Sequence, residues 1–159
     1  MTVNVIDADR LGELIQSAGD GGRRSSLLVV DCRPFTAFNA GHIVGAVNVH
    51  CPSIVRRRAG GVIPVANIVR STEALAALTS GRCSSVVVYD ESSTRVDELD
   101  AESNARLSLN SLATVTSTTP LCLLRGRPDN NGSVSFEKVD HCHTIIIIVS
   151  SGGLRRIYI

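Results

Sequence analysis

Short, largely apolar runs recur along the first part of the chain and are separated by polar stretches that contain glycine or proline. Runs of about four aliphatic residues are typical of strands that are buried on both faces, as in a parallel sheet. We predict five strands, at residues 3–6 (VNVI), 27–30 (LLVV), 46–49 (AVNV), 86–89 (VVVY) and 121–124 (LCLL).

Apolar residues at helical spacing lie between these runs. Leu11, Leu14 and Ile15 share one face of a helix that starts after Asp7, a suitable N-cap, and ends near Ser17. Further helices are predicted at residues 34–40, from Ser71 or Thr72 to Gly81, and at 105–113. Strands that alternate with helices predict an α/β fold, with a mostly parallel central sheet and helices on both of its faces.

Composition restricts the functions that such a domain can have. Of the 159 residues 43% are hydrophobic, which is enough for a packed core, although aromatic residues make up only 3%. A net charge of +1 gives no general attraction to polyanions, so we expect no nucleic-acid partner and only local electrostatic recognition. The longest aliphatic run, residues 145–149, is too short to span a membrane, and we expect no membrane partner.

The cysteine pattern favours a reducing compartment. The five cysteines are odd in number, form no CxxC pair, and follow a start (MTVNVIDADR) without the apolar run of a signal peptide. His141, Cys142 and His143 have no second cluster of ligands at zinc spacing. We therefore predict free thiols, no metal site and no cofactor.

The central stretch of the chain carries the most specific motif. Residues 31–48 contain D-C-R-x-x-x-x-F-x-x-G-H-I-x-G-A-x-N, and three arginines follow, Arg56, Arg57 and Arg58. The motif resembles the rhodanese/Cdc25-like homology domain. With the triple arginine, it resembles the amino-terminal kinase-docking domain of the MAP kinase phosphatases, a branch of the dual-specificity phosphatases. The similarity is strong over residues 27–69 and fair over residues 3–91.

Three adjacent guanidinium groups repel one another and are costly to bury, so they must face solvent or an acidic partner. A basic cluster next to apolar side chains fits docking onto an acidic patch beside a hydrophobic groove. The resemblance implies that this partner is the acidic common docking site of MAP kinases; the simpler alternatives are a solvated basic face or a localisation signal. The candidate docking residues are Ile54, Val55, Arg56, Arg57, Arg58, Val62, Ile63 and Val65.

Two features of the sequence bear on catalysis. In the rhodanese fold a catalytic cysteine begins the loop after a central strand. Here that position is Asp90, and the loop reads DESSTR. The carboxylates of Asp90 and Glu91 would repel an anionic substrate. His141–Cys142 begins like the phosphatase motif H-C-x-x-G-x-x-R, but Ile145 replaces the glycine and Ile148 the arginine. We expect no catalytic residues in this chain. The rival hypotheses are a sulfurtransferase that uses Cys32 or Cys51, and a regulatory module with a partner other than a kinase.

The other residues of the motif have structural interpretations. Asp31 is expected to cap a turn or pair with Arg33, Cys32 to be a packed thiol, and His42 to fix the Gly-His-Ile turn by a hydrogen bond, as the resemblance implies. Arg33 and Arg70 lie further from the triple arginine and are expected to be structural or incidental.

The expected domain covers residues 1–124. Residues 125–159 form a divergent tail that is either disordered, an extra strand, or an ending foreign to the family. The resemblance implies that the parent function is dephosphorylation of MAP kinase Thr and Tyr, hence negative regulation of MAP kinase signalling. By resemblance to the inducible members, a nuclear location is expected.

Overall fold

The structure is a computed structural model, which describes residues 2–19, 26–43, 45–116 and 118–126, together with the backbone of two strands beyond them, Ser135–Lys138 (β6) and Ile145–Ile148 (β7). The motif His141–Cys142 lies outside the described residues, as does His143.

Five parallel strands form the central sheet, in the spatial order β1-β5-β4-β2-β3. They are β1 (Asn4–Ile6), β2 (Ser26–Asp31), β3 (Val47–Asn48), β4 (Cys83–Tyr89) and β5 (Leu121–Leu124). The central strands β2, β4 and β5 lie next to one another, and those of their residues whose burial is described are almost all buried. All five predicted strands are therefore present, although β3 has two residues instead of four and β4 starts three residues early.

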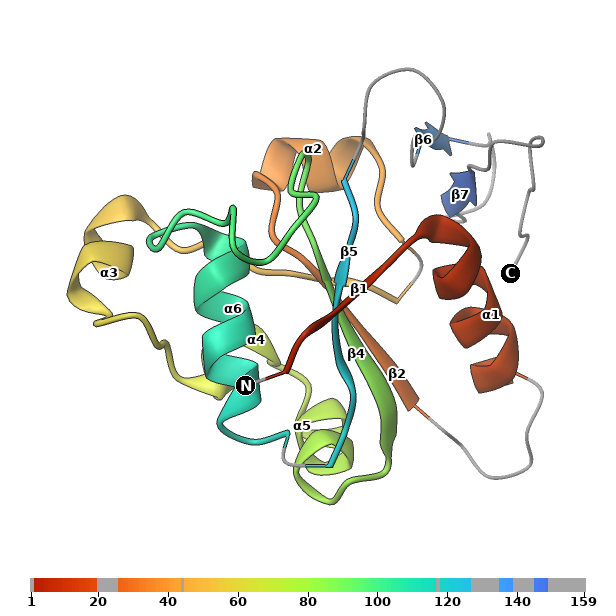
Figure 1. Ribbon diagram of the computed structural model, residues 1–159, viewed down its shortest axis with the longest axis horizontal. Coiled ribbons are helices and arrows are strands. Elements are labelled where there is room, and N and C mark those ends of the chain that lie inside the picture. Colours follow the sequence, from red (N-terminus) through yellow and green to blue (C-terminus); the bar gives the residue numbers. More distant parts are fainter. Residues whose placement is uncertain are drawn as a thin grey trace.

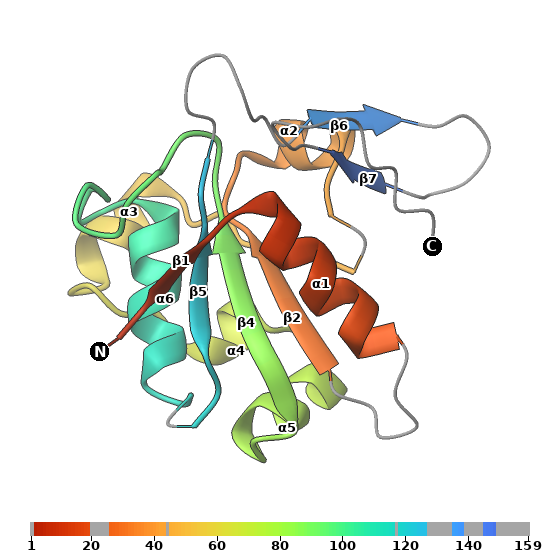
Figure 2. The same ribbon diagram turned by 45° about the vertical axis from the view of Figure 1, so that its right-hand side comes forward.

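Helices cover both faces of this sheet (Figures 1 and 2). Helix α1 lies on one face, and α4, α5 and α6 lie on the other, with α2 above the carboxyl ends of the strands. The helices are α1 (Ala8–Gly19), α2 (Phe35–Ala40), α3 (Ser53–Arg58), α4 (Val65–Ile68), α5 (Thr72–Thr79) and α6 (Asn104–Ala113). The α/β architecture predicted from the sequence is confirmed.

The strand alternation divides the core into two layers. Val29 and Val87, paired in register, belong to the layer that contains Leu11 of α1. The next pair, Val30 and Val88, belongs to the layer that contains residues of α4, α5 and α6. Side chains at successive strand positions point to opposite faces, which explains why an unbroken aliphatic run is needed here.

Sequence reasoning did not anticipate α3 and α4. Both start directly after a proline, Pro52 and Pro64, whose φ angles of −54° and −56° suit the entry to a helix. Among the predicted helices, α5 and α6 are capped by Ser71 and Ser103, whose hydroxyl groups each accept a backbone N–H of the first turn.

The tail contains two paired strands. β6 and β7 are antiparallel and form a two-stranded sheet separate from the central one, so residues 145–148 are a strand, as one of the open interpretations held. In the part of the chain that the structure describes, no helix has the length and apolar character needed to cross a membrane.

Candidate docking surface

Helix α3 presents the three arginines at its carboxyl end. All three lie in its last turn, where a cation is favoured by the helix dipole. Because successive helical residues are about 100° apart, the three side chains cannot face the same way. Arg57 and Arg58 are exposed, whereas Arg56 is half-buried and its Nε atom is buried without a hydrogen-bond partner in the described structure. Arg57 and Arg58 are therefore the cations most accessible to a partner.

Apolar side chains lie exposed around these cations. Ile54 is 58% exposed, Val55 42% and Val62 46%, and exposed aliphatic residues that gather on one segment are typical of interaction surfaces. Val65, on α4, is partly buried against the core. The expectation that Ile63 contacts a partner is wrong for this conformation, because its side chain is 2% exposed and belongs to the core.

The segment that contains α3 is attached to α6 at its start. Asn104, the first residue of α6, is 8% exposed, and its Oδ1 accepts the backbone N–H of Cys51 at 3.1 Å. Its Nδ2 lies 3.2 Å from Nδ1 of His50 and 3.4 Å from the carbonyl oxygen of Cys32. This one side chain therefore fixes the residues that lead into α3 against both α6 and the end of β2.

A second attachment follows α3. Nδ2 of Asn110 donates to the carbonyl of Gly61 at 3.0 Å, and the N–H of Ile63 donates to Oγ of Ser111 at 2.8 Å. Gly60 and Gly61 have φ angles of +57° and +86°, in the region where a side chain would strain the backbone. The turn after α3 thus reverses the chain onto α6, so that both ends of the arginine-bearing segment are fixed.

Sequence reasoning missed Asn104, Asn110 and Ser111. The available signal was polar residues among the leucines of α6: Asn104, Ser108 and Ser111 are all buried. Buried polar groups need hydrogen-bond partners, so such positions indicate where irregular backbone packs against a helix. Identifying the partner segment required the fold.

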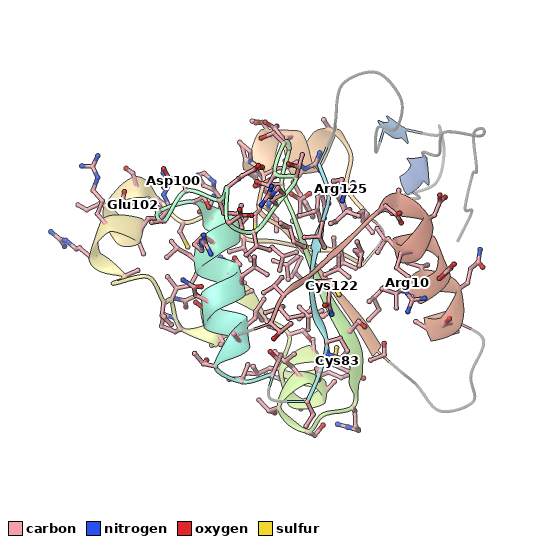
Figure 3. All side chains as sticks on the ribbon, in the orientation of Figure 1. Arg10, Cys83, Asp100, Glu102, Cys122 and Arg125 are labelled. Carbon is pink, nitrogen blue, oxygen red and sulfur yellow. The ribbon has the colours of Figure 1, made fainter. Side chains whose placement is uncertain are left out.

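An acidic side chain lies beside the arginines. Oε2 of Glu102 is 4.0 Å from Nε of Arg57, and both side chains are largely exposed. Figure 3 shows Glu102 and Asp100 on the segment that passes next to α3. The docking surface, defined here as Ile54, Val55, Arg57, Arg58 and Val62, therefore has Glu102 as an acidic neighbour.

The loop after β4 is folded around Asp90. Its Oδ1 accepts the backbone N–H groups of Ser92 and Ser93 at 3.0 and 2.8 Å, and its Oδ2 accepts the hydroxyl of Ser93 at 2.5 Å. The N–H of Gly126 donates to the carbonyl of Ser93 at 2.6 Å, and a Cβ at Gly126 would lie 2.7 Å from the backbone of Ser92. Two of the loop N–H groups that could bind an anion, those of Ser92 and Ser93, thus already bind a carboxylate of the chain itself.

The two thiols of the sulfurtransferase hypothesis, Cys32 and Cys51, both have raised pKa values. Burial raises the pKa of Cys32 to about 12, against the opposing effect of its hydrogen bond to Ser108. Burial also raises the pKa of Cys51, although the nearby guanidinium of Arg56 counteracts this. Since the thiolate is the reactive form, both residues are poorly suited to attack a sulfur donor at neutral pH. In the described part of the chain, Cys32, Cys51 and Cys122 are free thiols, and Cys142 lies outside it.

The remaining motif residues have the structural roles expected of them. Asp31 is fully buried and pairs with Arg33 at 2.6 Å, while its Oδ2 also accepts the hydroxyl of Tyr89 at 2.5 Å. Arg33 also donates to the carbonyl of Gly41, and Nδ1 of His42 lies 2.9 Å from the carbonyl oxygen of Phe38. These contacts fix the turn that follows α2. Among the described residues, no group of three or more His, Cys, Asp or Glu side chains could hold a metal ion.

Comparison with known proteins gives a consistent assignment. Residues 10–116 match the family model of the rhodanese-like domain. The chain is 45% identical over 100 residues to dual specificity protein phosphatase 4 of Homo sapiens, which covers 62% of this chain and 25% of that protein. It is 38% identical over 126 residues to dual specificity protein phosphatase 1 of Rattus norvegicus, covering 79% of this chain and 33% of that protein.

These relatives are longer proteins, and the chain spans a quarter to a third of their length, matching their amino-terminal region. A solved structure from Saccharomyces cerevisiae, of a homologue of single-domain rhodanese and the Cdc25 phosphatase catalytic domain, is also similar. It has a TM-score of 0.45 and 19% identity, and the match covers 78% of this chain and 76% of that one. On the family match and its α/β fold, the chain belongs to the rhodanese-like domain family.

Proposed function

We propose that this chain is a docking module that binds MAP kinases through the docking surface on α3. The observation that carries the proposal is the combination of two exposed guanidinium groups, Arg57 and Arg58, with exposed Ile54, Val55 and Val62. Guanidinium groups orient and attract an acidic patch, and aliphatic side chains gain binding free energy by leaving water. The relatives described above are dual specificity protein phosphatases, which supports a phosphatase-related role.

The attachment of α3 to α6 strengthens the proposal. A docking segment that is already held in position loses less conformational entropy on binding than a free peptide of the same sequence. Asn104 fixes the residues before α3, and Asn110 and Ser111 fix those after it. The surface thus presents its cations and apolar side chains in one arrangement before any partner arrives.

In a longer protein, this docking would deliver a MAP kinase to a phosphatase domain, which removes phosphate from its Thr and Tyr residues. The chain itself lacks the complete motif H-C-x-x-G-x-x-R in its sequence, so the module alone binds without hydrolysing phosphoester. It would compete with other proteins for the same acidic site on the kinase. By resemblance to the inducible phosphatases, this binding takes place in the nucleus.

The properties of the cysteines and of the loop after β4 argue against a sulfurtransferase. Asp90 occupies the position where the family's nucleophile begins its loop, and its carboxylate accepts the backbone N–H groups of Ser92 and Ser93. The raised pKa values of Cys32 and Cys51 disfavour their thiolates. A cyanide-dependent thiosulfate assay separates the two functions, since docking predicts no turnover.

The test is a titration of the chain against a panel of MAP kinases. Replacing Arg56, Arg57 and Arg58 by alanine is expected to weaken binding by roughly 2–4 kcal/mol, the scale of interface hot spots. A matched control removes three exposed arginines elsewhere, Arg10, Arg70 and Arg82, with the same change in net charge. Equal affinities of the two triple variants would remove the docking proposal.

A further inference from the structure

The segment that joins β4 to α6 brings negative charge to the docking surface. It carries five exposed acidic residues, which are Glu91, Asp97, Glu98, Asp100 and Glu102. This segment runs beside α3 in both ribbon views (Figures 1 and 2), and Figure 3 places the labelled Asp100 and Glu102 at that edge. Within the segment, Glu102 is the residue paired with a docking arginine, whereas Glu98 pairs with Arg95.

The ion pair between Arg57 and Glu102 is loose enough to be exchanged. Its N–O distance is 4.0 Å, and the two side chains are 75% and 60% exposed. Exposed pairs of this kind contribute little to folding and are screened by salt. A carboxylate from another protein can therefore replace Glu102 without the loss of a buried contact.

Glu102 nevertheless keeps a fixed backbone position. Its N–H donates to Oδ1 of Asp100 at 2.7 Å, and the following residue, Ser103, donates its N–H to the carbonyl of Asp100 at 3.0 Å. Ser103 caps α6, and Asn104 then fixes the segment before α3. The same attachments that position α3 therefore also hold Glu102 next to Arg57.

We propose that Glu102 is an internal competitor for Arg57, which lowers the affinity of the docking surface for acidic partners. This inference rests on the proposed docking function and names its specificity. A partner with one carboxylate only exchanges one pair for another, and gains little. A partner whose patch offers several carboxylates engages Arg57 and Arg58 together and outcompetes Glu102. The surface thus selects dense acidic patches over isolated acidic residues.

The test compares Glu102→Gln with a matched variant, Glu98→Gln, which removes the same charge from an exposed residue of the same segment. Both are titrated against a MAP kinase and against a polyglutamate peptide at low salt. We expect Glu102→Gln to bind both probes roughly two- to fivefold more tightly than the wild type, the range of an exposed ion pair. Glu98→Gln should bind as the wild type does.

Further outcomes separate this inference from the docking proposal. In an Arg57→Ala background, Glu102→Gln should give no further gain in affinity, because the guanidinium group for which Glu102 competes is absent. Equal gains in both glutamine variants indicate a general charge effect and overturn the inference, as does no gain in Glu102→Gln. If the wild type still binds the kinase in these cases and the arginine variants bind weakly, docking stands without the competitor. A chain that binds neither probe overturns both proposals.

Discussion

Oδ1 of Asn104 accepts the backbone N–H of Cys51 at 3.1 Å, which joins the start of α6 to the residues that lead into α3. The two residues are 53 positions apart in the sequence. Through this contact α6, which packs on the sheet, determines the position of α3, which carries the exposed arginines. The position of the candidate docking surface thus depends on a buried amide as well as on the arginines.

Replacing Asn104 by alanine should therefore affect both folding and binding. It leaves the N–H of Cys51 without its partner, and loss of a buried hydrogen-bond partner costs about 1–3 kcal/mol in the free energy of unfolding. The affinity for an acidic partner should fall as well, because α3 is then less well positioned. Urea unfolding and a kinase titration measure the two effects. Asn67→Ala, at an exposed position on α4, is the control and should change neither.

The buried pair of Asp31 and Arg33 makes the second prediction. Asp31 is 0% exposed, so Arg33→Leu would leave an uncompensated carboxylate in the core. Breaking a buried ion pair by removing one partner costs about 3–5 kcal/mol. Urea unfolding of this variant should show a loss of that size. Arg82→Leu, at an exposed arginine, should lie within about 0.5 kcal/mol of the wild type, and similar losses in both would contradict a structural role for the pair.

The loop after β4 offers a contrast between two neighbouring carboxylates. Asp90→Ala removes the acceptor of two backbone N–H groups and one hydroxyl, and should cost about 1–3 kcal/mol in unfolding free energy. Glu91→Ala, at an exposed position, should cost less than about 0.5 kcal/mol. Both variants should bind a MAP kinase like the wild type, because the loop is not part of the docking surface. A loss of binding on Asp90→Ala alone would place this loop in the interface.

Stability should decline at alkaline pH. Burial raises the pKa of Cys32 from 9.0 to about 12, and burial together with the nearby carboxylate of Asp31 raises the pKa of Tyr89. Between pH 9 and 12 the unfolded chain has lost protons that the folded chain keeps, so the free energy of unfolding falls as pH rises. Below pH 9 this contribution is fully present. Each group adds a slope of at most about 1.4 kcal/mol per pH unit.

Urea unfolding between pH 7 and 11, with reductant present, measures this decline. Cys32→Ala removes one of the titrating groups, so its unfolding free energy should fall less steeply above pH 9 than that of the wild type. An identical slope in both proteins would show that Cys32 does not carry a raised pKa.

The parts of the fold that follow regular patterns were predictable. Unbroken aliphatic runs such as Val86, Val87 and Val88 have only one plausible place, in a strand covered on both faces, and the structure puts them there. Asp31 and Arg33 are two residues apart on one strand end, so their pairing could be inferred from the sequence alone. The spacing of residues along the chain, together with the family resemblance, was enough to predict both the buried strand and the ion pair.

The docking surface was less predictable because it depends on distant contacts. Ile63 follows the arginines closely and looked like a partner contact, but Ser111, 48 residues away, binds its backbone and draws it into the core. Asn104, whose amide binds the residues before α3, and Glu102, whose carboxylate pairs with Arg57, are likewise far from α3 in the sequence. Such pairings are set by how α6 packs on the sheet, which no local pattern in the sequence specifies.

The most direct test of the docking account is an NMR titration of the isotope-labelled chain with a MAP kinase, following the backbone amide signals. The account predicts that the largest changes fall on residues 53–62 and on Glu102, and that they disappear when Arg57 and Arg58 are replaced by alanine. Largest changes on the loop after β4 or on the edge strand β1, with residues 53–62 unaffected, would contradict it.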